Sequence, residues 1–223
     1  AGEGEAGVEL WGVRRGGRGG EGSGVGGQTG VGRGEGEGEG YKEFYMRLPE
    51  FFKSLAGFFP FPYQQRWADQ LLQGKSVILR VPTGAGKTWA MVAPFLYSMA
   101  TGRRLADRLL YALPRRSLAS SLFATTQQQM RGVLERVVTT GKDRDYTSAA
   151  TFCSLQIGGQ KDDPFFESDL VLTTSDQLLS SYILLPVSLP NRLGNMNAGS
   201  LPGSLVVFDE IHLLDPSVAL GTA

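Results

Sequence analysis

Residues 82–88, with the sequence PTGAGKT, have the composition of a loop that holds phosphate groups. Gly84 and Gly86 allow the backbone to approach phosphate oxygens and to point its N–H groups at them. A helix-forming run begins at Lys87, and a helix N-terminus favours an anion. Lys87 would reach the β- and γ-phosphates and Thr88 would ligate Mg²⁺, which predicts an ATP–Mg²⁺ site. The residues expected to contact the nucleotide here are Thr83, Gly84, Ala85, Gly86, Lys87 and Thr88.

A pair of carboxylates, Asp209 and Glu210, follows the apolar run Leu205–Phe208. An apolar strand would carry Asp209 to the carboxyl edge of a sheet, where ligands bind in open α/β folds. Asp209 would contact the Mg²⁺ shell, and Glu210 would polarise the attacking water as a general base. The sequence therefore predicts Lys87, Asp209 and Glu210 as catalytic residues and Thr88 and Asp209 as the metal-binding pair.

The elements that must position these groups alternate along the chain. Strand-forming runs are expected at Ser76–Val81, Leu109–Leu113, Ala150–Leu155, Leu170–Thr174 and Leu205–Phe208. Helical runs are expected at Gln64–Gln73, Lys87–Ala100, Ser117–Val138 and Asp176–Tyr182. This alternation predicts an α/β fold with a central parallel sheet and helices on both faces. The continuously apolar run 205–208 is expected to be a central strand, and the Pro-, Gly- and Asn-rich residues 186–203 a loop insertion before it.

Residues 1–40 differ from the rest of the chain. They hold 18 of the 31 glycines, mixed with Glu and Arg, and few aliphatic residues. Such a segment cannot bury enough apolar surface to offset its ordering entropy, so we expect a disordered Gly/Glu-rich tail. We expect residues 41–223 to form one globular domain. Most of the aromatic residues near its start are expected in the core: Phe44, Tyr45, Phe51, Phe52, Phe58, Phe59 and Phe61.

The composition excludes several classes of function. Lys+Arg and Asp+Glu number 22 each, which argues against a strongly basic protein that coats nucleic acid. Cys153 is the only cysteine and His212 the only histidine, whereas zinc sites and metal-dependent nucleases draw on several such ligands. No apolar stretch approaches the ~20 residues that span a bilayer. We expect a reduced, cytoplasmic chain without a membrane segment, in which Cys153 is a buried thiol.

Several of these segments together resemble the superfamily 2 DExD/H-box helicases. The form PTGxGKT is theirs; in the general phosphate-loop pattern a glycine would stand at Val81. Residues 60–64 (PFPYQ) resemble their Q motif, which implies that Gln64 hydrogen-bonds the adenine edge. Residues 209–212 (DEIH) resemble their DExH box, which implies that His212 couples the nucleotide to the motor core. The resemblance implies a RecA-like P-loop NTPase domain that hydrolyses ATP with Mg²⁺.

Two further segments resemble the helicase motifs that grip the phosphodiester backbone. Residues 111–118 (YALPRRSL) resemble motif Ia, and residues 173–178 (TTSDQL) resemble motif Ib. The resemblance implies that Arg116, Thr174 and Ser175 bind nucleic acid, and their charge and hydroxyl groups suit that chemistry. A glycine pair at Gly158 and Gly159 follows the third expected strand, as in the family.

Within the superfamily, the residues of these motifs are most similar to those of the CRISPR-associated helicase-nuclease of type I systems. The features are LPxRxL in motif Ia, TxDQ in motif Ib, DExHxxD with Asp215, and the insertion before the DExH strand. The resemblance implies recruitment by a CRISPR surveillance complex and translocation on single-stranded DNA rather than RNA. It also implies a second RecA-like domain and an HD nuclease that are missing here, so we expect this fragment alone to be nearly inactive.

Other readings remain open at this point. The chain could belong to another superfamily 2 ATPase, such as an RNA helicase or a restriction-type translocase, and stimulation by DNA or RNA would separate them. It could be a non-motor P-loop module that binds a nucleotide for regulation, although the Q-motif and motif Ia and Ib matches speak against that. A pure interaction protein would make the phosphate loop and the acidic pair accidental.

Overall fold

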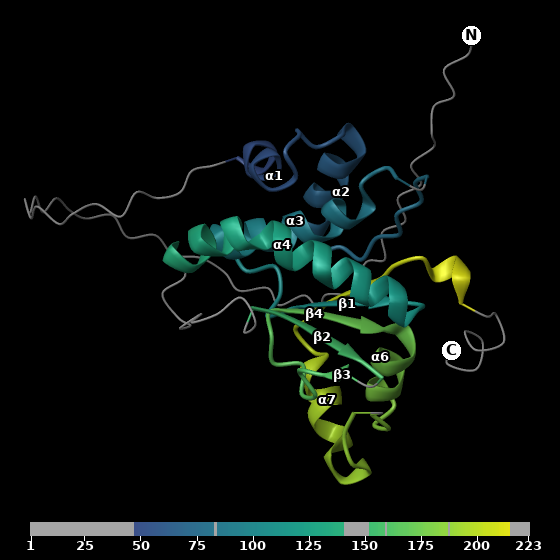
Figure 1. Ribbon diagram of the computed structural model, residues 1–223. Coiled ribbons are helices and arrows are strands. Elements are labelled where there is room, and N and C mark those ends of the chain that lie inside the picture. Colours follow the sequence, from purple (N-terminus) through teal and green to yellow (C-terminus); the bar gives the residue numbers. More distant parts are fainter. Residues whose placement is uncertain (1–46, 83, 141–151, 159, 187, 215–223) are drawn as a thin grey trace, which may run out of the picture.

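The computed structural model describes residues 47–82, 84–140, 152–158, 160–186 and 188–214. The Gly/Glu-rich tail, Thr83, Gly159 and Asp215 lie outside the described residues, as do Phe44 and Tyr45. Within the described part, five strands form one sheet that has helices on both sides (Figure 1). This is the predicted α/β fold, and it is consistent with a RecA-like domain.

The sheet has the order β3-β2-β4-β1-β5. Its strands are β1 (Leu109–Leu113), β2 (Cys153–Ile157), β3 (Gln160–Lys161), β4 (Leu170–Thr174) and β5 (Leu205–Phe208). All neighbours pair in parallel except β2 and β3, which are antiparallel. Because β1 lies between β4 and β5, and their carboxyl ends are in register, the chain segments that follow these three strands emerge at one edge of the sheet.

The alternation of side chains along β1 separates two cores. Leu109, Tyr111 and Leu113 belong to the larger cluster, on the face covered by the helices α1 to α4. Leu110 and Ala112 belong to a smaller cluster with Phe166, Val171 and Leu178 on the other face. All five residues of β1 are buried, as expected for a parallel strand covered on both sides.

The helices divide between the two faces (Figure 1). On one face lie α1 (Leu48–Ala56), α2 (Pro62–Leu72), α3 (Lys87–Ala100) and α4 (Arg116–Thr140). On the other face lie α6 (Ser175–Tyr182) and α7 (Gly194–Ser200), which pack against each other. None of the described helices combines the length and the apolar composition that a membrane crossing requires.

The insertion before β5 is more regular than the sequence suggests. We expected a loop over residues 186–203, but the structure has a 3-10 turn at Asn191–Leu193 (η1) and the helix α7 there. The side chain of Asn197 on α7 is buried and donates a hydrogen bond to the hydroxyl of Ser181 on α6. Packing against α6 thus stabilises a helix that its Gly- and Asn-rich sequence would not favour alone.

Two expectations about strands are wrong. The run Ser76–Val81 forms no regular strand; only Ser76 makes an isolated bridge, although Val77 and Leu79 pack against the core. In the described part of the chain β5 is the end strand of the sheet rather than a central one, and Val206 and Phe208 are each 38% exposed. The two errors have one physical cause, because an apolar, β-branched run forms a ladder only where a partner strand lies beside it.

Candidate nucleotide-binding site

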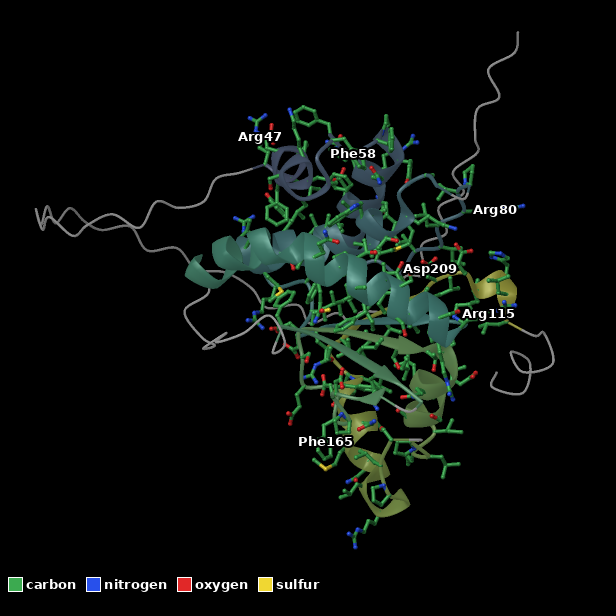
Figure 2. The ribbon with its side chains drawn as sticks, in the orientation of Figure 1. Arg47, Phe58, Arg80, Arg115, Phe165 and Asp209 are labelled. Atoms are coloured by element: carbon green, nitrogen blue, oxygen red, sulfur yellow. The ribbon has the colours of Figure 1, made fainter. Side chains whose placement is uncertain are left out.

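The predicted phosphate loop and the acidic pair meet at the carboxyl edge of the sheet. The N–H of Asp209 donates to the carbonyl of Ala112 at 2.9 Å, which extends the β5–β1 pairing by one residue. The phosphate loop ends where α3 begins, at Lys87. Figure 2 shows Asp209 and Arg115 at the end of the sheet to which the arrows of β2 and β4 point, whereas Phe165 lies in another part of the molecule.

Lys87 and Glu210 form an ion pair across 123 positions of sequence. Lys87 Nζ lies 2.7 Å from Glu210 Oε1, and their side chains are only 18% and 21% exposed. The other oxygen, Glu210 Oε2, lies 3.3 Å from Nδ1 of His212. One carboxylate thus contacts both the lysine of the phosphate loop and the histidine of the DExH box. The His212 side chain is 69% exposed, so it is not a packed core histidine.

The backbone turns sharply at Glu210. This residue has φ 51° and ψ 37°, in the left-handed region that non-glycine residues rarely adopt. Its N–H donates to Oδ1 of Asp209 at 2.8 Å, which stabilises the turn and fixes one oxygen of that carboxylate. The turn directs the two adjacent acidic side chains to different partners, Asp209 to β1 and Glu210 to Lys87.

Tyr111 is a site residue that the sequence analysis did not identify. Its hydroxyl donates to Oδ2 of Asp209 at 2.7 Å, and the side chain of Thr88 lies close enough to lower the pKa of the phenol. Burial and then the Asp209 carboxylate raise the pKa of Tyr111 well above its usual value, so the phenol stays protonated and remains a donor. The sequence could have indicated this role, because a lone tyrosine in an otherwise aliphatic buried strand must find a polar partner.

Tyr63 and Gln64 on α2 hold the phosphate loop from the other side. The hydroxyl of Tyr63 donates to the carbonyl of Ala85, and Nε2 of Gln64 donates to the carbonyl of Gly86 at 2.9 Å. Oε1 of Gln64 accepts from the N–H of Phe61 at 2.8 Å, and the Gln64 side chain is buried. Burial raises the pKa of Tyr63, and the neighbouring Gln64 side chain opposes that rise.

Both glycines of the phosphate loop need to be glycine. Gly84 and Gly86 each have φ 80°, and a Cβ at Gly86 would lie 2.9 Å from Nε2 of Gln64. The positive φ is strained for any L side chain, and at Gly86 the space is also taken. The loop therefore has the glycine conformation at both positions.

The aromatic cluster before α2 divides between core and surface. Phe51 and Phe52 are buried, as predicted, whereas Phe58, Phe59 and Phe61 are 39%, 54% and 49% exposed, so that expectation is wrong for these three. The ring of Phe61 stacks on Tyr63 with centroids 6.3 Å apart and contacts Phe58 at 5.7 Å. An exposed aromatic surface thus adjoins the residues that hold the phosphate loop.

The residues predicted to bind nucleic acid lie at the same edge of the sheet, after β1 and at the end of β4. Arg116 begins α4 and is exposed, and a Cβ at Gly158 would collide with its guanidinium group. Thr174 ends β4 opposite Leu113 and is 5% exposed. Ser175 begins α6, is 1% exposed, and its hydroxyl has no hydrogen-bond partner among the described residues.

The residues of the site fit a magnesium nucleotide. Thr88 and Asp209 supply a hydroxyl and a carboxylate, and Mg²⁺ prefers such oxygen ligands. Lys87 and the turn of the loop supply positive charge and N–H groups for phosphates. Tyr111 already fixes one oxygen of Asp209, and Thr88 lies beside the same phenol.

Comparison with known proteins agrees with this geometry. Residues 61–219 match the family model of the DEAD/DEAH box helicase. The chain is 31% identical over 143 residues to "Reverse gyrase 1" of Aquifex aeolicus, which covers 61% of this chain and 11% of that protein. It is 40% identical over 60 residues to "Reverse gyrase" of Pyrobaculum aerophilum, covering 27% of this chain and 5% of that protein.

A third relative is named for another system. The chain is 28% identical over 154 residues to "CRISPR-associated helicase Cas3" of Thermoproteus tenax, which covers 65% of this chain and 25% of that protein. The chain therefore spans a quarter or less of the length of these relatives. No solved structure matches the chain.

Proposed function

Because the chain belongs to the DEAD/DEAH box helicase family, we propose that residues 47–214 hold ATP with Mg²⁺ for a motor that acts on nucleic acid. The observation that carries the proposal is the meeting of Lys87, Glu210 and Asp209 at one edge of the sheet. An ordinary surface loop with the sequence GKT would have no reason to contact an acidic pair 123 positions away.

The chemistry follows from the positions of these groups. Lys87 would exchange its contact with Glu210 for the β- and γ-phosphates, which frees that carboxylate to orient and deprotonate the attacking water. The Mg²⁺ ion would neutralise developing charge on the phosphate oxygens, held through Thr88 and Asp209. His212, in contact with Glu210, would transmit the change in the partner of Glu210 to the rest of the motor.

Gln64 would recognise the base. Its amide carries N–H donors and an oxygen acceptor, which bond Gly86 and Phe61 in the described structure. An adenine edge offers the complement, an N–H donor at N6 and an acceptor at N7. Phe61, whose N–H bonds Gln64, has an exposed ring that contacts the exposed ring of Phe58, and these rings would pack on the base.

We propose single-stranded DNA as the substrate, and a CRISPR surveillance complex as the partner that recruits the full-length protein. The residues of the helicase motifs and the similarity to a CRISPR-associated helicase support this assignment of substrate and partner. Arg116 would contact phosphate through its exposed guanidinium, and Thr174 and Ser175 through the start of α6 rather than through freely exposed hydroxyls. The second RecA-like domain, the HD nuclease and a cytoplasmic location belong to the same proposal.

A second candidate is the motor part of an enzyme of the kind named reverse gyrase. Three relatives with that name match at 28–40% identity, so the helicase core alone does not separate the two systems. Both candidates share the ATP site and the roles of Lys87, Asp209 and Glu210. They differ in what the rest of the protein does.

The experiment that tests the proposal measures ATP hydrolysis by the chain joined to its second domain, with single-stranded DNA, double-stranded DNA or RNA added. We expect single-stranded DNA to stimulate hydrolysis more than RNA, and Lys87→Ala to abolish it under every condition. Stimulation by RNA alone would remove the DNA assignment and leave the ATP site standing. Co-purification with a CRISPR surveillance complex would then favour the first candidate over the second.

A further inference from the structure

Tyr111 occupies a position in the strand β1 that packing alone would give to an aliphatic residue or to phenylalanine. It is fully buried between Leu110 and Ala112, and its ring lies on the face of the sheet that α3 and α4 cover. A buried hydroxyl costs free energy unless it is hydrogen-bonded, so the hydroxyl must be there for its partners.

Its partner is Asp209. The hydroxyl of Tyr111 donates to Oδ2 of Asp209 at 2.7 Å, and the side chain of Thr88 lies close enough to lower the pKa of the phenol. The hydrogen bond links β1 to the segment after β5, beside the first turn of α3. Thr88 and Asp209 are the two residues that supply oxygen ligands in the proposed function.

The contact with Tyr111 also fixes the second oxygen of the Asp209 carboxylate. Its Oδ1 accepts from the N–H of Glu210, and its Oδ2 accepts from Tyr111. Groups that fix the orientation of a metal-binding side chain contribute to metal affinity without touching the metal. Loss of the Tyr111 hydroxyl would leave Oδ2 without this hydrogen bond, so that the carboxylate is held only through Oδ1.

We propose that Tyr111 is a positioning residue for magnesium, whose hydroxyl holds the Asp209 carboxylate in the orientation that receives the Mg²⁺–nucleotide complex. The inference rests on the proposed ATP site and adds a residue to it. It separates two parts of binding, since Lys87 and Gln64 would contact the nucleotide itself whereas Tyr111 acts only on the carboxylate that holds the metal.

The test compares Tyr111→Phe with Tyr97→Phe. Tyr97 lies on α3, packs its ring against Phe51 in the same core, and is remote from the acidic pair in sequence and contacts. A fluorescent ATP analogue is titrated with Mg²⁺, and again in EDTA. We expect Tyr111→Phe to raise the Mg²⁺ midpoint about tenfold, the loss expected for a hydrogen bond to a charged group. Affinity in EDTA, and both values for Tyr97→Phe, should stay as in the wild type.

A second measurement asks whether Tyr111 acts through Asp209. In an Asp209→Asn background, Tyr111→Phe should change the Mg²⁺ midpoint by less than about twofold, because the two substitutions remove the same arrangement. Thermal melts of each variant verify folding. If Tyr111→Phe does not fold, 3-fluorotyrosine at position 111 of the otherwise unchanged chain gives a ¹⁹F resonance that should shift when Mg²⁺ joins the nucleotide.

The outcomes separate this inference from the proposed function. A Tyr111→Phe protein with a lower melting temperature but an unchanged or lower Mg²⁺ midpoint would show a merely structural role and overturn the inference. A ¹⁹F resonance insensitive to Mg²⁺ would do the same. If the wild type and Lys87→Ala bind the analogue alike and without Mg²⁺ dependence, the ATP site itself is wrong and both proposals fall.

Discussion

Lys87 Nζ and Glu210 Oε1 lie 2.7 Å apart, so the lysine of the phosphate loop and the candidate general base hold each other. Neither group can do its proposed work while it is paired. Lys87 must turn to the phosphates, and Glu210 must turn to water. When Lys87 turns to the phosphates, Glu210 is released to contact water. Nucleotide binding and activation of the general base would therefore occur together.

Substitution of Glu210 by Gln should divide binding from hydrolysis. The amide keeps the shape of the side chain but no longer pairs with Lys87 as an ion, and it no longer repels the phosphates. We expect the ATP analogue to bind about threefold to tenfold more tightly, while single-turnover hydrolysis falls about 100-fold or more. The matched control is Glu167→Gln at an exposed position before β4, which should change neither. Weaker binding by Glu210→Gln would contradict the account.

Removal of the Tyr63 hydroxyl should loosen the phosphate loop. Tyr63→Phe keeps the ring stacked on Phe61 and deletes only the bond to the carbonyl of Ala85. We expect the affinity for the ATP analogue to fall about threefold to tenfold, the effect of one ordinary hydrogen bond, with little change in melting temperature. Tyr182→Phe, at a side chain 70% exposed, provides the control. Equal affinities for the two variants would show that the Tyr63 contact does not order the loop.

Two glycines with the same backbone conformation offer a test of the loop itself. Gly86 has φ 80° and Gly57, after α1, has φ 83°, but only at Gly86 would a Cβ approach another side chain, that of Gln64. Gly86→Ala and Gly57→Ala should each lose about 1–2 kcal/mol of stability from the left-handed backbone. Nucleotide binding should be lost in Gly86→Ala alone. Comparable binding by both variants in calorimetric titrations would argue against a phosphate-binding role for this turn.

The single cysteine should be inert in the folded protein. Burial raises the pKa of Cys153 from 9.0 to about 12, so at pH 8 the thiol is neutral and inaccessible. A thiol reagent should label it only after denaturation. Because the unfolded chain releases this proton near pH 9 and the folded chain only near pH 12, Cys153 also lowers stability as the pH rises through that window. Rapid labelling of the native protein at pH 8 would show that β2 opens readily.

Much of the site could be predicted from the sequence because its groups are close in sequence or follow from strand order. Lys87 and Thr88 come after two glycines, and Asp209 and Glu210 follow an apolar run, so periodicity and spacing indicate both. The rule that ligands bind at the carboxyl edge of parallel strands predicts the place of Asp209 and Glu210, whereas the phosphate loop reaches the same edge without a strand before it. The buried Cys153 and the helices α3 and α4 were predicted on equally local grounds.

The features that could not be predicted depend on contacts between segments that are far apart in the sequence. The apolar run 205–208 does not reveal whether a strand lies on each side of it, and the run 76–81 has strand-forming residues without a paired strand in the described structure. The roles of Tyr63 and Tyr111 depend on contacts 22 and 98 positions away. The helix α7 is stabilised by packing on α6, which local helix propensity does not predict.

The measurement that tests the central claim most directly is binding of a fluorescent ATP analogue with Mg²⁺ to the wild type, Lys87→Ala and Gln64→Ala, each verified by a cooperative thermal melt. The account predicts that Lys87→Ala abolishes binding and that Gln64→Ala binds but loses its preference for adenine over guanine. A folded Lys87→Ala protein that binds the analogue as the wild type does would contradict it.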